Sequence, residues 1–246
     1  MTMRQSPLSR VSACMRHMTL ALVTACGVMA VQAGEVAVRM VESDTWGVTL
    51  EVTTAEVTLL PVSGSDGQWY RLEPGNMAVS TVPGQPALPR QGVLLAIPAN
   101  AGLTLTIGDA RYDDIAGRAI LPNLPRQLQS DMPLWQLIER SIDQDFYARD
   151  SLLPESPVSI GFTGQLREQP VAQILFHPVQ VNPAAHKLRV YRQLRVRVAF
   201  DSPLPSTDTA DTGSRVLAAG SPGQGAADPF ATLLHHALIN AGQVRR

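Results

Sequence analysis

The sequence predicts a mostly β fold, an antiparallel β-sandwich-like domain with one or two short helices. Apolar and polar residues alternate in residues 48–53, 103–107 and 188–200, which is the period of a strand with one buried face. Proline and glycine punctuate the chain between such stretches, as they do at turns. Only residues 133–142 and 230–241 carry an apolar face with helical spacing.

The first 33 residues have the pattern of a secretory signal peptide. Arginines precede the apolar stretch 18–31, and a small-residue cleavage site follows at Val31–Ala33. Cleavage there predicts a bacterial protein that is secreted, periplasmic or on the cell surface, with a mature chain from Gly34. A second interpretation stays open: Val23–Cys26 has the form of a lipoprotein box, in which a lipid on Cys26 would tie the protein to a membrane.

Charge and cysteine content exclude several functions for the mature chain. The net charge is −1 with mixed signs, which does not suggest a nucleic-acid partner. Cys14 and Cys26 both lie in the predicted signal, so the chain from Gly34 has no cysteine for a disulfide, a thiolate metal site or a nucleophile. The sequence also has no phosphate loop and no Gly-x-Ser-x-Gly elbow. We therefore expect no catalytic residues, no cofactor and no small-molecule substrate.

The N-terminal part of the predicted β domain, residues 34–200, reads as short strands. Residues 36–54 hold the first strand pattern, and Val48, Leu50 and Val52 alternate strictly with polar residues. Further strands are predicted at residues 55–62 and 68–72, separated by a turn at 64–67.

Residues 82–98 combine proline and glycine punctuation with a buried-strand pattern. Three prolines remove backbone donors, so residues 81–90 are expected to run extended along a surface. The apolar run 93–97 follows and ends at Pro98. Because residues 99–102 have turn composition, we predict a hairpin between residues 92–97 and 103–107.

Residues 112–142 depart from the strand patterns that precede them. Residues 112–126 contain Pro122, Pro125 and several charges, which predicts an exposed excursion. Residues 133–142 are then expected to form a short helix with Asp131 as N-cap.

The strongest strand patterns lie at residues 158–166, 171–179 and 188–200. The alternation in the last one slips near 191–193, and a β-bulge there would keep the apolar residues on one face. Residues 180–186, with Asn182–Pro183 as initiator, are expected to form the turn before it.

The C-terminal part divides into two segments. Residues 201–229 are rich in Ser, Pro, Gly, Ala, Asp and Thr, which predicts a flexible linker. Residues 230–246 begin with an amphipathic helix over 230–241, with Gly242 as stop signal, and could be the start of a missing domain.

The polar residues with metal-binding chemistry lack metal-site spacing. His177 is expected to be a hydrogen-bonded residue at a strand end, and His235 and His236 are neighbours that point apart on a helix. Asp113–Asp114 and the pair Asp143 and Asp145 lack the dense spacing of a calcium loop. We therefore predict no metal site.

Three motifs in order resemble the N-terminal propeptide of gingipain-type cysteine peptidases, family C25. The first runs from residue 84 to 98, the second from 176 to 183 and the third from 188 to 200. The residues that carry the resemblance as structural positions are Gly84, Pro86, Leu88, Pro89, Ile97, Pro98, Pro178, Asn182, Pro183 and Tyr191.

The resemblance implies a secreted β-sandwich-like prodomain that keeps a caspase-like peptidase domain latent and helps it to fold, in cis or in trans. In the family, a loop covers the active site and can present a basic residue, for which Arg118 and Arg126 are candidates here. Arg245–Arg246 would suit a processing site. The alternative is a stand-alone cell-surface or periplasmic β-sandwich interaction module. Packing of the terminal helix on the sandwich would favour this alternative.

Overall fold

The computed structural model describes residues 36–62, 69–124, 132–204, 233 and 236–243, and all structural statements concern these residues. The predicted signal peptide and most of the predicted linker therefore lie outside the described residues. The same holds for several residues singled out in the sequence, namely Cys14, Cys26, Ala33, Arg126, Asp131, His235, Arg245 and Arg246.

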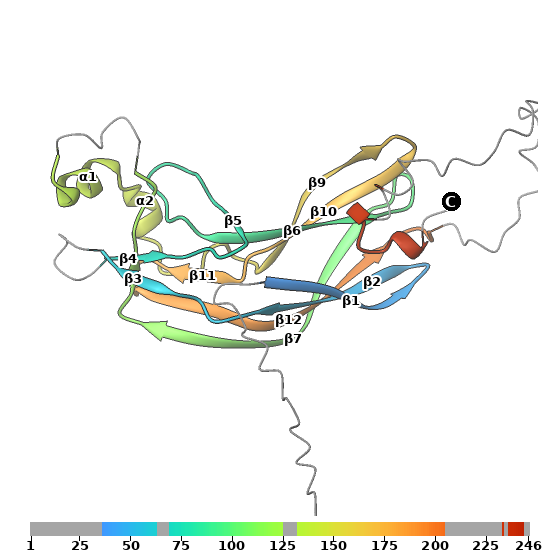
Figure 1. Ribbon diagram of the computed structural model, residues 1–246, viewed down its shortest axis with the longest axis horizontal. Helices are drawn as coiled ribbons and strands as arrows, with labels where there is room; N and C mark the ends of the chain where they lie inside the picture. Colours follow the sequence, from blue (N-terminus) through green and yellow to red (C-terminus); the bar gives the residue numbers. More distant parts are fainter. Residues whose placement is uncertain (1–35, 63–68, 125–131, 205–232, 234–235, 244–246) are drawn as a thin grey trace, which may run out of the picture. The chain divides into compact units, whose positions relative to one another are not determined.

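A five-stranded antiparallel sheet forms one layer of the fold (Figure 1). Its longest strands, β7 and β12, pair with each other along almost their whole length. The opposite edge of β12 pairs first with β11 and then with β2, which in turn pairs with β1. The strands are β1 (Val36–Asp44), β2 (Gly47–Thr54), β7 (Leu103–Ala116), β11 (Val179–Asn182) and β12 (Lys187–Phe200).

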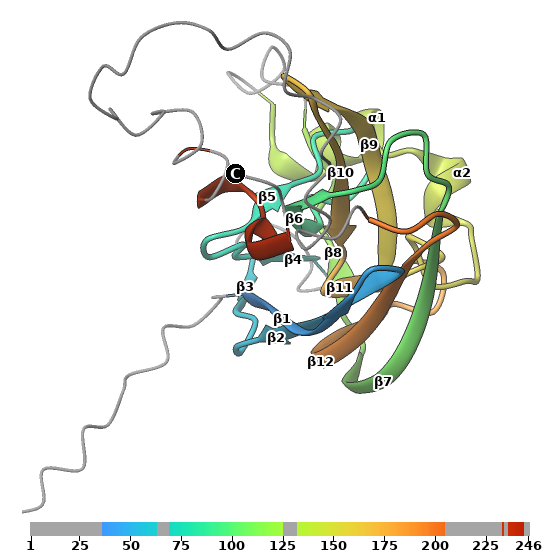
Figure 2. The same ribbon diagram turned by 90° about the vertical axis from the view of Figure 1, so that its right-hand side faces the viewer.

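A four-stranded antiparallel sheet faces the first one (Figure 2). Its strand order is β5-β6-β10-β9, so β9 forms one edge and the short β5 covers only the beginning of β6 on the other. The strands are β5 (Ala78–Val79), β6 (Pro89–Ala96), β9 (Val158–Leu166) and β10 (Gln169–Phe176).

Smaller elements close one end of the two layers. Strands β3 (Leu59–Pro61), β4 (Trp69–Leu72) and β8 (Ala119–Ile120) form a three-stranded sheet in which β4 and β8 are parallel. Two short helices follow, α1 (Leu134–Ser141) and α2 (Gln144–Tyr147), and the 3-10 turn η2 (Ala241–Gln243) lies near the C-terminus.

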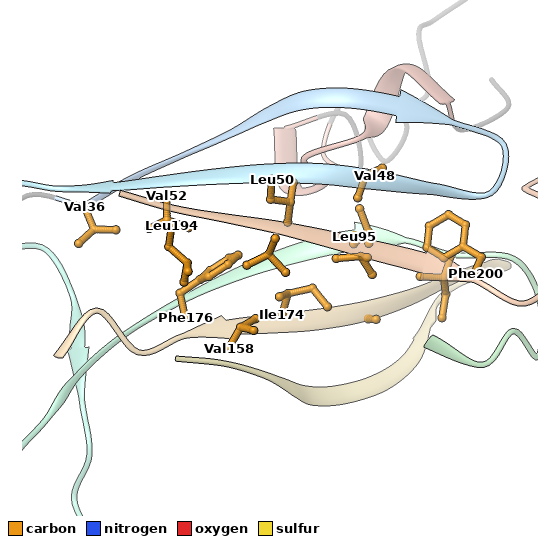
Figure 3. Close-up of a cluster of buried hydrophobic side chains, with 14 of the residues drawn as sticks. Val36, Val48, Leu50, Val52, Leu95, Val158, Ile174, Phe176, Leu194 and Phe200 are labelled. Carbon is orange, nitrogen blue, oxygen red and sulfur yellow. The ribbon is translucent and has the colours of Figure 1, made fainter. Parts of the chain in front are cut away.

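The main core lies between the two large sheets (Figure 3). Leu50 and Leu194 from the five-stranded sheet meet Leu95, Ile174 and Phe176 from the four-stranded sheet, and all are almost completely buried. Each such side chain contributes about 1.5–3 kcal/mol through the area it removes from water. The antiparallel β-sandwich that the alternation of apolar residues predicted is therefore confirmed.

A second core cluster ties the small elements to the first half of β12. Leu188 and Val190 of β12 pack there with Ile120 of β8, Leu72 of β4 and Phe146 of α2. The single strand β12 thus contributes to both clusters, because its inward-facing residues continue from one to the other.

Several local predictions are confirmed. Strand patterns at residues 158–166 and 188–200 match β9 and β12, and the helix expected at 133–142 is α1. The β-bulge expected near 191–193 is present, because the register with β7 shifts between Tyr191 and Gln193.

The predicted hairpin between residues 92–97 and 103–107 is wrong. β6 pairs with β5 and β10, whereas β7 pairs with β12, so the turn after Pro98 carries the chain from one sheet to the other. The expected turn at 180–186 is shorter than predicted, because β11 continues to Asn182 and the turn spans 183–186.

The excursion predicted at residues 112–126 is instead a strand up to Ala116, although residues 112–114 and 116–117 are exposed as expected. β7 continues to Ala116 because β12 offers a partner along its full length, and residues 119–121 are buried.

Two predicted helix ends are wrong, the start of the helix at residues 133–142 and the end of the helix at residues 230–241. α1 is preceded by Pro133 as N-cap with no side-chain cap hydrogen bond, so Asp131 does not hold that position. The helix expected to continue to Ala241 ends before Leu238, since Leu238 forms a β-bridge with Leu94.

Candidate functional site

The proline-rich residues 82–88 contact two later parts of the chain, at Asn123 and at Asp143. The main-chain N–H of Gly84 donates to the carbonyl of Asn123 at 3.1 Å. The carbonyl of the same residue accepts from the N–H of Asp143 at 3.0 Å. Gly84 therefore holds both ends of residues 124–142, which we call the 124–142 stretch. We call its two fixed ends, at Asn123 and Asp143, the base of the stretch.

Only glycine fits at position 84. Its φ is +76°, in the left-handed region that favours glycine. A Cβ added there would lie 2.4 Å from the carbonyl oxygen of Ser141 and 2.9 Å from the main-chain nitrogen of Asp143. The close approach of the two backbones thus depends on the missing side chain.

Asn123 fixes the first end of the stretch. Its side-chain Nδ2 lies 3.0–3.1 Å from the carbonyl oxygens of Ser80, Val82 and Gln85. Its main-chain N–H also donates to the carbonyl of Gln85 at 2.8 Å. A single amide side chain therefore organises the carbonyls of the proline-rich residues, which have few backbone donors of their own.

Asp143 fixes the second end. Its carboxylate accepts from Gln85 Nε2 at 3.0 Å and, as the N-cap of α2, from the N–H of Phe146 at 2.9 Å. These two hydrogen bonds, the one from Gln85 first, hold the pKa of the Asp143 carboxyl below its usual value. The N-cap arrangement starts α2 immediately after the base.

The helices beside the base present one large exposed ring. Leu137 and Ile138 of α1 are buried, whereas Trp135 on the same helix is 51% exposed. Tyr147 of α2 donates its hydroxyl to the carbonyl of Ile120 at 2.6 Å, and burial raises its pKa. The helices are thus fastened to the sandwich while Trp135 faces outward.

The candidate Arg118 does not lie in the 124–142 stretch. It sits in the turn between β7 and β8, where its guanidinium lies 4.6 Å above the ring of Tyr70 and Nη1 donates to the carbonyl of Gly117. Its main-chain N–H donates to the carbonyl of His186 at 2.9 Å. By sequence, the other candidate, Arg126, belongs to the 124–142 stretch but lies outside the described residues.

Most of the remaining motif residues hold the scaffold together. Leu88 and Ile97 are buried in the two core clusters, and Pro89 begins β6. The hydroxyl of Tyr191 donates to Gln180 Oε1 at 2.7 Å in a buried site. The carbonyls of Pro98 and Pro178 accept main-chain hydrogen bonds, and Pro86 forms a β-bridge with Pro122. The side chain of Asn182 accepts from the N–H of Ala185 and so caps the turn that starts at Pro183.

The outer face of the five-stranded sheet is covered by ion pairs. Glu51, only 2% exposed, accepts from Arg39 Nε at 2.8 Å and from Arg195 Nη2 at 3.0 Å. The hydrogen bonds from these arginines, Arg39 first, lower the pKa of Glu51 to about 2.

The neighbouring acidic pair is likewise held by basic side chains. Asp114 pairs with Arg189 and Lys187, which lower its pKa to about 2, and Asp113 pairs with Arg192 at 2.6 Å. Within the described residues, no group of three or more His, Cys, Asp or Glu side chains lies close enough to hold a metal ion.

His177 follows β10 and is hydrogen-bonded. Its Nε2 lies 3.1 Å from the hydroxyl of Ser159 on β9, and burial, followed by the charge of Arg90, lowers its pKa. The described residues also contain no helix that is long and apolar enough to span a membrane.

Sequence reasoning missed Asn123 and Gln85 as residues of the base. A signal was present for Asn123, because it stands between Pro122 and Pro125, which have no N–H of their own, and its side-chain amide adds donors at this place. Its partners could not be seen in the sequence.

Comparisons with known proteins agree with the fold and the motifs. The family model Propeptide_C25 matches residues 30–220. In a structure of the complex of Porphyromonas gingivalis RgpB pro- and mature domains, one chain is similar with a TM-score of 0.64 and 16% identity, over 84% of this chain and 97% of that one. A structure on the zymogenic latency of gingipain K from Porphyromonas gingivalis is similar with a TM-score of 0.50 and 16% identity, over 69% and 94%. No curated protein sequence matches.

Proposed function

Because this chain belongs to the family of C25 propeptides, we propose that it is a non-catalytic prodomain that inhibits a gingipain-like cysteine peptidase domain and helps it to fold. The observation that carries the proposal is the base of the 124–142 stretch. Its two ends, at Asn123 and Asp143, are fixed by hydrogen bonds to Gly84 and Gln85. A stretch held at both ends loses less conformational entropy on binding a partner than a free one.

Arg126 supplies the chemistry that such a stretch needs. A guanidinium offers five N–H donors in a planar fork, which fits a carboxylate at the bottom of a pocket specific for basic side chains. Trp135, exposed on α1 beside the base, supplies apolar contact area for the same partner. In this proposal the partner is a caspase-like peptidase domain, bound in cis or in trans.

Inhibition of a purified peptidase tests the proposal directly. Residues 34–246 would be titrated into a gingipain-like peptidase domain from the same source, and the residual activity on a peptide substrate measured. We expect inhibition at micromolar concentration or below. Absence of binding at that concentration would contradict the inhibitor role.

A matched pair of arginine variants separates the two candidate residues. Arg126→Ala should weaken inhibition by about 10- to 100-fold, since it removes a hydrogen-bonded charge from the interface. Arg118→Ala serves as the control, because its guanidinium already lies over Tyr70 and bonds to Gly117. Equal losses in both variants would contradict the assignment.

The role in folding needs a separate measurement. The denatured peptidase domain would be diluted into buffer with and without residues 34–246, and the recovered activity compared after removal of the prodomain. A higher yield with the prodomain is expected. We also propose export with cleavage after Ala33, which N-terminal sequencing of the exported protein would check by giving Gly34 as first residue.

One observation favours the second candidate, a stand-alone interaction module. Leu238 and Asn240 near the C-terminus are buried against the sandwich. The gene sequence beyond the codon of Arg246 distinguishes the two candidates, since a peptidase domain there would support the first.

A further inference from the structure

The C-terminal segment Leu238–Ala241 contacts strand β6 in the manner of an added strand. Leu238 forms a parallel β-bridge with Leu94, and the N–H of Ile239 donates to the carbonyl of Leu94 at 2.9 Å. The side-chain amide of Asn240 continues the pairing, since Oδ1 accepts from the N–H of Ala96 at 2.8 Å and Nδ2 donates to its carbonyl at 3.0 Å. The amide side chain thus replaces one peptide unit of a strand.

Leu238 and Ile239 face opposite sides of the sheet, as consecutive residues of a strand do. Leu238, 4% exposed, packs on Ala96 and Val171 on the outer side of the four-stranded sheet. Ile239 packs instead against the core between the two large sheets. Asn240 is completely buried, so its two hydrogen bonds with Ala96 are shielded from water.

The place of attachment is explained by the short strand β5. β5 pairs only with Pro89 and Arg90, so the rest of that edge of β6 has no neighbouring strand apart from the C-terminal segment, as far as the structure describes the chain. Uncovered edges expose unpaired N–H and carbonyl groups and readily accept another extended segment.

The sandwich does not depend on this segment for its cores. Both large clusters are built from buried residues between Val36 and Leu204, and the segment adds only the partly buried Ile239. The third cluster is different, because Leu238 covers Ala96 and Val171 there.

We propose that the β6 edge at Leu94–Ala96 is a strand-addition site whose ligand is the chain's own segment 238–241, and that this segment separates from the sandwich without unfolding it. The inference is independent of the proposed function, because it concerns the isolated chain. Its consequence is that a cut between Leu204 and Leu233 leaves the C-terminal fragment attached by non-covalent contacts. Before the cut, the covalent link keeps the local concentration of the segment high.

Hydrogen exchange of the full chain tests the pairing and its separability together. Asn240→Ala should speed exchange of the Ala96 amide about tenfold or more, since the variant removes two buried hydrogen bonds. The matched control is Gly242→Ala, because a Cβ at Gly242 meets nothing within 4 Å. We expect the control to leave exchange unchanged and both variants to keep amide protection in β2, β10 and β12.

Two results would overturn the proposal. Unchanged exchange at Ala96 in Asn240→Ala would mean that the segment does not protect the edge. Loss of protection in β2 and β12 together with Ala96 would mean that the segment is an inseparable part of the fold.

A second experiment measures attachment after cleavage. A recognition sequence for a site-specific protease would be placed between residues 210 and 220, and the full chain cut and passed over a sizing column at about 100 μM. The C-terminal fragment should elute with the sandwich, and excess synthetic peptide of residues 233–246 should displace it. A fragment that elutes alone at this concentration contradicts the proposal.

Discussion

The base of the 124–142 stretch and the outer face of the five-stranded sheet are held in opposite ways. At the base, uncharged backbone groups of Gly84 approach two distant segments, and a Cβ would not fit. On the outer face, long charged side chains reach across three neighbouring strands to Glu51. Long side chains can rearrange when one partner is lost, whereas backbone contacts cannot. The comparison teaches that the base is the less tolerant region, and it is the region to which we assign function.

Gly84→Ala should have the largest effect. The substitution combines a positive φ with a clash against the Ser141 carbonyl, so we expect the free energy of unfolding to fall by about 2–3 kcal/mol. Gly117→Ala is the matched control, because φ is +70° but a Cβ there meets nothing within 4 Å, and about 1 kcal/mol is expected. Urea unfolding measures both, and equal losses would show that backbone strain rather than close approach matters at position 84.

Asn123→Ala tests whether the side-chain amide holds the base. Its contacts with three carbonyls predict a loss of about 2 kcal/mol and weaker inhibition of the peptidase. Asn182→Ala, whose side chain bonds to Asp150 and the Ala185 amide at an exposed turn, should lose about 0.5–1 kcal/mol. If inhibition is unchanged in Asn123→Ala, the base does not position the inhibitory residue.

Glu51→Gln tests the outer face through pH. Because the folded-state pKa lies near 2, below the ordinary value of 4.5, the carboxylate contributes stability above pH 4.5 that is lost as the pH falls towards 2. The variant should therefore be less stable at pH 7 and show a flatter decline of the urea midpoint between pH 5 and pH 2. A decline as steep as that of the unchanged chain would assign the acid sensitivity to other carboxylates.

Asp113→Asn should have the smallest effect. Asp113 is 56% exposed at the side chain and makes one ion pair, with Arg192, so the loss should stay below about 0.5 kcal/mol. A thermal melt in low and high salt measures it. A loss above 1 kcal/mol would mean that the exposed pairs of this face act as a network.

The sequence predicted what depends on neighbouring residues and missed what depends on distant ones. Alternation in Leu188–Val198 indicated a strand and the bulge at Arg192, since both follow from the local period. The same alternation at residues 103–107 could not show which sheet the strand joins, so the hairpin with residues 92–97 was wrong. Charges at Asp113 and Asp114 suggested an excursion rather than a strand, because the arginines of β12 that pair with them come about 75 residues later.

The base shows the same limit. Gly84 and its prolines indicated an extended segment along a surface, whereas the structure has a turn at Gly84, and nothing near them in sequence pointed to Ser141 or Asp143. Asn123 gave a weak signal through its flanking prolines, and its carbonyl partners lie about 40 residues earlier. The predicted inhibitory residue Arg126 remains a prediction.

The central place of β12 has a consequence for synthesis on the ribosome. β2 is buried along almost its whole length, yet its partner β12 lies about 140 residues later in the chain. At a translation rate of about 5–20 residues per second, roughly 7–30 s pass between the synthesis of β2 and that of β12. We expect a chain that ends at Asn182 to bind an apolar dye strongly and to lack amide protection in β2. The nascent protein therefore carries an uncovered apolar strand until β12 is made, and its five-stranded sheet is the last of the three sheets to become complete.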